Sequence, residues 1–352
     1  MLRINTLLFY FIPVAIFSQN IAIIQYKIDK SCYKFSIEGI WNTKNNNQLI
    51  TAKENHPKDG KFYVKTDDKF PLSYRFVCGD GKSFRVSRLF TIASGNHFKF
   101  EIDSIVADKQ YLPISKKSLL IQDQQQFYKA FPDTENLYSE NDDIYRTNLI
   151  RYITSFEVYS RQHPNSYMLF WNLVDFFEEN SYLTGYNDGY LKTFNNLSPT
   201  IRNSIYGKKF YRKIINFSKI KVGSRFPHIN LKEGKKYSLG TKYTLIDFWA
   251  TYCKPCLEVL SEYKKLYERY KNSGFEIVSI SGDRLQDIDK WKKMIKSKEL
   301  NWQQYIDIEG NESEKYSITA FPSTFLLDSE GKIIKKDISP KELEKFMEEN
   351  LK

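Results

Sequence analysis

The sequence predicts three successive parts: a small antiparallel β-sandwich, a mostly helical region, and a C-terminal α/β domain with a central mixed sheet and helices on both faces. Three observations support this prediction. Short segments of alternating apolar and polar residues occupy residues 19–114, apolar residues recur at helical spacing in residues 115–218, and strand-like and helix-like segments alternate through residues 219–352. A chain of 352 residues with 41% hydrophobic residues is long enough for several domains.

Residues 1–18 have the pattern of a secretory signal peptide. Arg3 provides a positive start, residues 6–17 are apolar, and Ser18 is a small residue suited to cleavage. This apolar stretch is short for a bilayer span, and no cysteine sits just after it to carry a lipid anchor. We expect export to the periplasm or cell envelope without a lipid anchor. An uncleaved N-terminal anchor is the alternative, because the residues just before Ser18 are bulky.

Residues 19–114 have the pattern of a β domain. Turn residues separate segments in which apolar and polar residues alternate, and the clearest of these segments are residues 33–39, 61–65, 74–78 and 98–102. This pattern predicts the small antiparallel sandwich. Cys32 and Cys78 fall in this domain, where an exported protein can form a structural disulfide. Two unpaired cysteines are the alternative.

Residues 115–218 are predicted to be mostly helical. Apolar residues keep a helical period over residues 149–156, the turn at residues 163–166 interrupts it, and residues 168–177 are apolar nearly all round. Ser198 and the proline after it predict the start of a further helix. We interpret the aromatic residues here as core, and the region as a spacer or clamp without catalytic residues.

The C-terminal part, residues 219–352, alternates between strands and helices. The predicted elements are a strand ending at Phe248, a helix to about Tyr270, a strand at residues 275–281, a helix at about residues 285–298, a hairpin at residues 324–334 and a last helix from Ser339 to Leu351. This alternation predicts a sheet covered by helices.

Two cysteines follow the first of these strands and open the first helix. We expect Cys253 at the helix N-terminus, facing solvent, and Cys256 one turn further in. The partial positive charge of a helix N-terminus favours a thiolate, and Lys254 adds to it. A thiolate attacks disulfides, so Cys253 is the predicted nucleophile and Cys256 the resolving cysteine of a redox disulfide. Pro255 is tolerated in the first turn of the helix.

A structural zinc site is the main alternative use of a CxxC pair. Such a site needs two further ligands at local spacing. Cys32 and Cys78 are far away and form no second CxxC, and the nearest histidine along the chain is His228. We therefore expect no metal site, and no cofactor.

The segment D-F-W-A-x-x-C-x-x-C at residues 247–256 resembles the active-site segment of thioredoxin-fold proteins, and residues 320–332 resemble the strand and hairpin that follow the cis-proline of that fold. A finer resemblance is to the TlpA-like, membrane-side thiol–disulfide oxidoreductases. It rests on V-G-x-x-F-P at residues 222–227, I-V-S-I-S-G-D at residues 277–283, and Trp291. The resemblance covers about residues 220–352.

This resemblance implies that Pro322 is cis, faces the two cysteines and shapes the substrate groove. Tyr252 stands where the family usually has tryptophan, and Lys254 where glycine is commoner, which leaves the redox potential open. The β domain weakly resembles domains of unassigned function that precede TlpA-like domains in exported proteins. The residues implied to contact substrate are Trp249, Tyr252, Lys254, Pro255, Phe321 and Pro322.

Asp247 is the third predicted catalytic residue. It lies in an apolar strand six residues before Cys253, at the position of the buried acid in thioredoxin. Burial raises the pKa of a carboxyl group, and such a group can accept the proton of Cys256 as that thiol attacks a mixed disulfide. A surface aspartate at a strand end is the alternative.

The predicted function is that of an exported thiol–disulfide oxidoreductase. The resemblance implies that it works as a reductase on exported proteins with disulfides and takes electrons from a membrane partner. A thiol peroxidase is one alternative, although peroxidases usually use one reactive cysteine without a CxxC. A partner-binding protein with an accessory redox domain is the other. A net charge of +11 can indicate a nucleic-acid partner, but the lysines here are dispersed among acids, so we expect none.

Overall fold

The computed structural model describes residues 21–28, 34–39, 59–65, 70–79, 84–93, 97–102, 119–132, 137–229, 237–318 and 320–351. The predicted signal peptide and the predicted Cys32–Cys78 disulfide lie outside the described residues and side chains. The chain divides into two compact units, one of Met1–Ser139 with Asn165–Asn172 and one of Glu140–Pro164 with Leu173–Lys352. Within the described ranges, every helix is too short or too polar to cross a membrane.

The N-terminal strands form two sheets. Their bounds are β1 (Ile21–Ile28), β2 (Lys34–Gly39), β3 (Asp59–Lys65), β4 (Leu72–Gly79), β5 (Phe84–Val86), β6 (Phe90–Ile92) and β7 (His97–Ile102). One sheet has the order β3-β1-β7, and the other has β2-β4-β5 with β6 also paired to β4. Strand β7 runs parallel to β1, so the prediction of purely antiparallel pairing is wrong for this pair. Alternation identifies a strand but not the direction of its neighbour.

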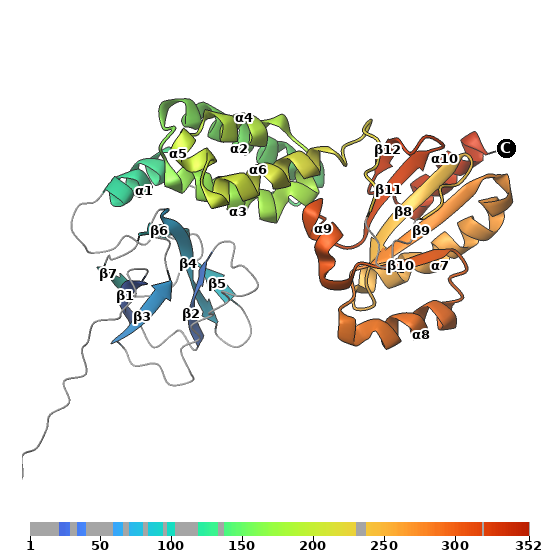
Figure 1. Ribbon diagram of the computed structural model, residues 1–352, viewed down its shortest axis with the longest axis horizontal. Helices are drawn as coiled ribbons and strands as arrows, with labels where there is room; N and C mark the ends of the chain where they lie inside the picture. The colour runs from blue at the N-terminus through green and yellow to red at the C-terminus, as the bar shows by residue number, and fades with distance from the viewer. Residues whose placement is uncertain are drawn as a thin grey trace, which may run out of the picture. The chain divides into compact units, whose positions relative to one another are not determined.

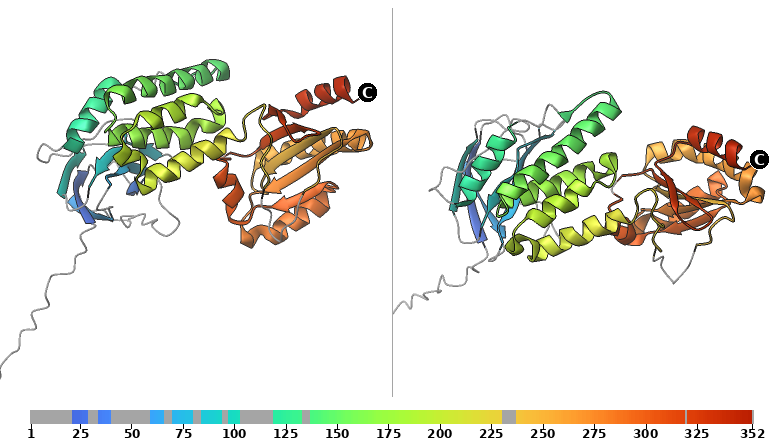
Figure 2. Two further views of the ribbon diagram at one scale, coloured as in Figure 1. Left: turned by 45° about the horizontal axis from the view of Figure 1, so that its top comes forward. Right: turned by 90° about the horizontal axis from the view of Figure 1, so that it is seen from above.

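The region predicted to be helical contains α1 (Leu119–Ala130), α2 (Asp142–Gln162), α3 (Tyr167–Thr184), α4 (Asp188–Asn196), α5 (Pro199–Arg202) and α6 (Ile205–Ser218). Helix α4 packs against α2 and α6 (Figures 1 and 2). The aromatic residues form core, as expected: the Phe177 ring meets the rings of Tyr190 and Phe210 edge-on. Ser198 precedes α5 without a side-chain cap, whereas the Ser204 hydroxyl caps α6.

The C-terminal domain has the predicted mixed sheet, with the strand order β10-β9-β8-β11-β12. Strands β8, β9 and β10 are parallel, and β11 is antiparallel to both β8 and β12. The strands are β8 (Tyr243–Trp249), β9 (Phe275–Ser281), β10 (Gln303–Ile306), β11 (Ser323–Asp328) and β12 (Ile333–Lys336). The helices are α7 (Lys254–Tyr270), α8 (Ile288–Lys298), α9 (Asn311–Lys315) and α10 (Pro340–Asn350), with short 3-10 helices at Lys271–Ser273, Leu285–Asp287 and Ile308–Gly310. Strand β10 and helix α9 were not predicted from the sequence.

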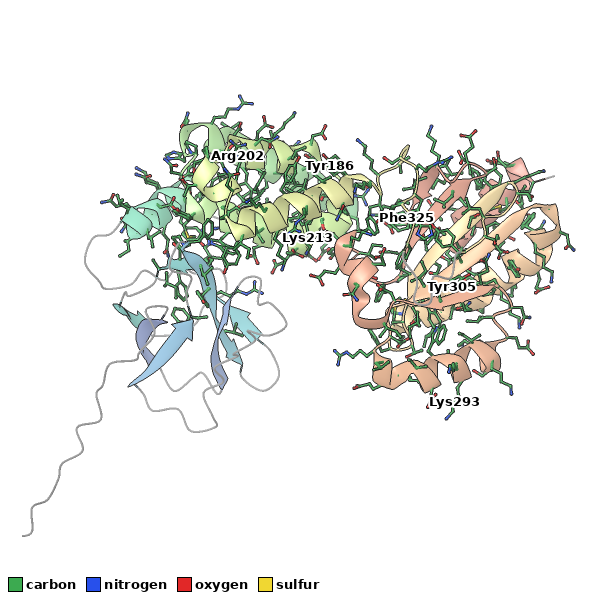
Figure 3. All side chains as sticks on the ribbon, viewed as in Figure 1. Tyr186, Arg202, Lys213, Lys293, Tyr305 and Phe325 are labelled. Atoms are coloured by element: carbon green, nitrogen blue, oxygen red, sulfur yellow. A yellow bond between two sulfur atoms is a disulfide. The ribbon has the colours of Figure 1, made fainter. Side chains whose placement is uncertain are left out.

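Alternation along β8 decides which side chains lie beneath α7. Leu245 and Trp249 belong to the same buried cluster as Cys256 and Tyr263 of α7. Phe248 points to the opposite face, where its ring and that of Phe226 pack against Phe325 of β11 at centroid distances of 6.2 and 5.2 Å (Figure 3). Residues 245, 247 and 249 therefore face the helix that carries the cysteines.

Candidate active site

Cys253 is the N-cap residue of α7 and is bonded to Cys256, with an S–S distance of 2.03 Å. Its Sγ also accepts a hydrogen bond from the Cys256 N–H at 3.2 Å. Cys253 is 8% exposed and Cys256 is 1% exposed. The order of exposure is as expected, but Cys253 does not face solvent openly, because the disulfide holds its sulfur against the buried one. Tyr252, just before Cys253, is strongly exposed, at 62%.

The turn before Cys253 is tied to the end of β9. The Thr251 N–H donates to both Asp283 carboxylate oxygens at 3.2 and 3.0 Å, and the Thr251 hydroxyl donates to Oδ1 at 2.6 Å. The Ser281 hydroxyl donates to Oδ2 of the same carboxylate at 2.6 Å. Asp283 and Thr251 are both buried. This network determines the path of the chain into the CxxC segment.

Asp247 lies beneath α7, as its place in β8 requires. It is 1% exposed, and its Oδ2 accepts a hydrogen bond from the Ser279 hydroxyl at 3.0 Å. Burial raises the pKa of Asp247 to about 7, and the hydrogen bond from Ser279 opposes this rise. Burial raises the pKa of Tyr263 of α7, and the nearby negative charge of Asp247 raises it further. A carboxyl group with a pKa near neutrality can exchange protons with a neighbouring thiol.

The peptide bond between Phe321 and Pro322 is cis. Ser323 follows directly and pairs with Phe248, so this loop meets β8 where the chain leaves for the cysteines. The Phe321 ring lies so close to Gly282 that a Cβ there would be 2.5 Å from a ring atom. The structure thus brings together the three segments that the sequence analysis singled out: the cysteine pair, the proline loop and the end of β9.

The residues predicted to contact substrate differ in exposure. Tyr252, Lys254 and Pro255 are exposed, and Phe321 and Pro322 are half-buried. Trp249 is fully buried in the cluster beneath α7, because alternation along β8 places its indole, like Asp247 two residues before it, on the face toward the core. The contact of Trp249 with substrate stays a prediction.

Several residues near the site were not predicted from the sequence. Thr251 and Asp283 hold the turn, Ser279 contacts Asp247, and Trp302 in turn contacts Ser279. Leu285, two residues after Asp283, is 63% exposed. One signal was available: Ser279 and Asp283 are polar residues in and just after a strand that is mostly apolar and almost entirely buried.

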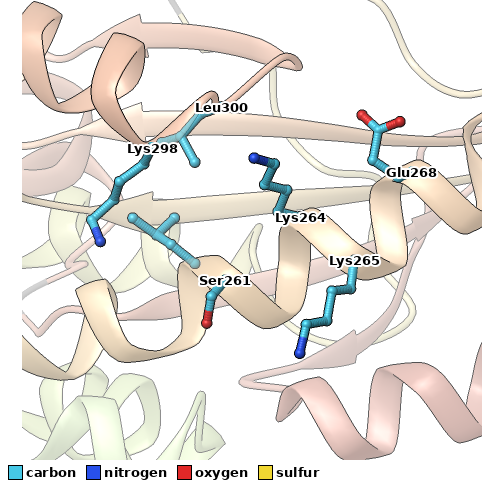
Figure 4. A pocket seen from close by; sticks show the side chains of 7 residues that line it. Ser261, Lys264, Lys265, Glu268, Lys298 and Leu300 are labelled. Atoms are coloured by element: carbon cyan, nitrogen blue, oxygen red, sulfur yellow. The ribbon is translucent and has the colours of Figure 1, made fainter.

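A groove of about 490 Å³ lies beside the middle of α7 (Figure 4). Leu260 and Leu300 are its apolar residues, and Lys265 and Lys298 also line it. Lys264, another lining residue, pairs with Glu299 at 2.6 Å. The lining contains neither cysteine nor any residue of the proline loop, so this groove is distinct from the disulfide site.

Replacing Gly282 with alanine is expected to displace the Phe321 ring and with it the proline loop, because the added Cβ overlaps the ring. We expect a roughly tenfold loss of kcat/KM for a protein disulfide, since misplacing a binding surface by an ångström is costly. A small aromatic disulfide, which needs less of this surface, should lose less. Equal losses for both substrates, measured side by side, would contradict a role of this contact in substrate binding.

A family model described as the AhpC/TSA family matches residues 222–336. The thiol-disulfide oxidoreductase ResA of Bacillus thuringiensis subsp. konkukian is 32% identical over 139 residues, covering 38% of this chain and 79% of that protein. The sporulation thiol-disulfide oxidoreductase A of Bacillus subtilis is 27% identical over 119 residues, covering 33% of this chain and 72% of that protein. A solved thioredoxin domain of a thiol-disulfide oxidoreductase from Bacteroides vulgatus is 31% identical, covering 38% of this chain and 99% of that chain, with a TM-score of 0.34.

The similarity to ResA extends over most of that protein's length at an identity of 32%. It agrees with the mixed sheet, the disulfide at the start of α7 and the cis-proline loop described above. The chain therefore belongs to the ResA-like, or TlpA-like, family of thioredoxin-fold thiol–disulfide oxidoreductases.

Proposed function

We propose that the chain is an exported thiol–disulfide oxidoreductase that reduces disulfides in exported proteins. The observation that carries this proposal is the Cys253–Cys256 disulfide at the N-terminus of α7, whose outer sulfur is the more accessible one. Export is supported by the signal-peptide pattern of residues 1–18, with an uncleaved anchor as the alternative form.

In the proposed cycle, Cys253 is the nucleophile. As the N-cap residue it lies at the positive end of α7, and its Sγ accepts the Cys256 N–H, so the structure favours a thiolate at this position. The Cys253 thiolate attacks one sulfur of the substrate disulfide. The other substrate sulfur leaves as a thiolate and takes a proton from water, and a mixed disulfide joins enzyme and substrate.

Cys256 then resolves the mixed disulfide. Its thiol gives a proton to the Asp247 carboxylate and attacks the Cys253 sulfur, and the second substrate sulfur leaves as a thiolate. Two electrons have passed from the enzyme dithiol to the substrate, and the enzyme is left with the disulfide that the structure contains. Asp247 suits this role because it is buried on the face of β8 beneath α7, and its pKa is raised to about 7.

The substrate is proposed to lie across the exposed turn and the proline loop. Tyr252, Lys254 and Pro255 present exposed side chains, and Phe321 and Pro322 are half-buried beside the end of β8. Backbone groups next to the proline can pair with an extended substrate segment. A membrane partner that supplies electrons is proposed to restore the dithiol, and the helical region is proposed to set the redox domain against such partners.

The equilibrium potential of the cysteine pair tests the direction of electron flow. We expect a value near that of thioredoxin, about −270 mV, when the full chain is equilibrated with dithiothreitol buffers and its free thiols are counted by alkylation. A value near −120 mV would make the protein an oxidant of its substrates and overturn the reductase proposal. A pair that does not cycle at all would overturn the proposed exchange and favour the binding-protein alternative.

A further inference from the structure

A row of polar side chains crosses the sheet beneath α7. Asp247 of β8 pairs with Ser279 of β9, and Ser279 pairs with Gln304 of β10. Residues that pair across neighbouring strands point to the same face of the sheet. Asp247 and Ser279 are buried almost completely, and Trp302, just before β10, is 6% exposed. Polar groups in such a place need partners, so their hydrogen bonds carry weight.

Two of these hydrogen bonds form a chain that ends at the proposed proton acceptor. Trp302 Nε1 donates to Ser279 Oγ at 2.9 Å, and Ser279 Oγ donates to Asp247 Oδ2 at 3.0 Å. An indole N–H can only donate, so Ser279 must accept from Trp302. The serine hydroxyl has one proton, which is then directed at the carboxylate. A hydrogen bond donated to a carboxylate stabilises its charged form.

We propose that Ser279 and Trp302 are positioning residues of the redox site: Trp302 orients the Ser279 hydroxyl, and the hydroxyl keeps Asp247 in the ionised state that accepts the Cys256 proton. This inference rests on the proposed role of Asp247. Neither residue touches substrate or sulfur in the proposed cycle. Both act by setting the pH range in which the resolving step is fast.

Two opposing influences act on Asp247. Burial raises its pKa, and the hydrogen bond from Ser279 lowers it, with the result near 7. Other groups lie on the same side of the sheet. Tyr263 of α7 interacts with the charge of Asp247, Thr324 of β11 pairs with Asp247, and Cys256 belongs to the same buried cluster as Tyr263. Glu262 and Asp337 act on Tyr263 rather than on Asp247. Removing the serine hydroxyl would leave burial largely unopposed.

The direct test measures the titration of Asp247 in the reduced full chain. In Ser279→Ala, the pKa of Asp247, followed by its 13C carboxyl shift, should rise by about one unit, the size expected for a lost hydrogen bond to a charged group. At pH 7 the ionised fraction, and with it the rate of the resolving step, should then fall about fivefold. Ser279→Thr, which keeps the hydroxyl, should restore both values.

Trp302→Phe tests the hydrogen bond from Trp302 to Ser279, because it removes the indole N–H and keeps an aromatic ring. It should shift the Asp247 titration in the same direction by less than Ser279→Ala does. Trp291 provides a matched control: it is partly buried against the same cluster, and its Nε1 has no hydrogen-bond partner among the residues that the structure describes. Trp291→Phe should therefore leave the titration of Asp247 unchanged.

The outcomes separate this inference from the proposed function. An unchanged Asp247 titration in both Ser279→Ala and Trp302→Phe would overturn the inference. An Asp247 pKa that rises while the pH profile of the resolving step stays in place would overturn the role of Asp247 as proton acceptor. If Ser279→Ala fails to fold, Trp302→Phe decides the question, because it removes the indole N–H and leaves the Ser279 hydroxyl in place.

Discussion

Replacing Cys253 with serine is expected to abolish disulfide exchange, and replacing Cys256 with serine is expected to trap the substrate on Cys253. A serine hydroxyl stays protonated at neutral pH, so the first variant should lose activity by at least about a thousandfold. The second variant keeps the proposed nucleophile at the N-cap of α7 but lacks the buried sulfur that is proposed to complete the exchange. It should therefore stop at the mixed disulfide.

Turnover is measured by reduction of a disulfide-bonded protein, and trapping by the mass of the enzyme under non-reducing conditions. Ser261→Ala is a suitable control, because Ser261 lies on the exposed side of the same helix and outside the buried cluster of the cysteines. The control should retain full activity. If Cys253→Ser traps substrate and Cys256→Ser does not, the two cysteines have the opposite roles.

The parts of the fold that were predictable have strong local patterns. Strand β8 is mostly apolar and is buried from Thr244 onward, and α7 has apolar residues at helical spacing with proline in its first turn. Strand β10, with the sequence Gln-Gln-Tyr-Ile, is a half-buried edge strand without an apolar run, and α9 has five residues, too few to show a period. Tertiary pairing, rather than local pattern, forms these two elements.

The residues of the candidate site also divide into those that a local sequence pattern reveals and those that it does not. The places of Cys253, Cys256 and Asp247 in the fold were predictable, because each has a chemical signature within one short segment, and their catalytic roles stay predictions. The contacts of Asp283 with Thr251, and of Trp302 with Ser279, join segments separated by 32 and 23 residues, so no local pattern reveals them. The expectation that Cys253 faces solvent was wrong for a different reason: the disulfide holds its sulfur against the buried Cys256.

Replacing Asp247 with asparagine is expected to stabilise the oxidised protein at high pH relative to the wild type. The folded-state pKa of Asp247 is about 7, raised by burial from 3.8, so folding favours the protonated form. Its contribution to the free energy of unfolding is therefore largest below pH 4 and is lost as the pH rises through 7. A difference of about three pH units corresponds to roughly 4 kcal/mol. Asparagine cannot ionise and avoids this loss.

Urea unfolding at pH values from 4 to 8 measures the effect, and in the oxidised protein neither Cys253 nor Cys256 titrates. The stability of Asp247→Asn relative to the wild type should increase steadily over this range and level off above pH 7. Asp289→Asn is the control, because Asp289 is exposed on α8 and its replacement should add no such trend. A constant difference between Asp247→Asn and the wild type would mean that folding does not raise the pKa of Asp247, and a carboxylate with so low a pKa is a poor acceptor for the proton of Cys256.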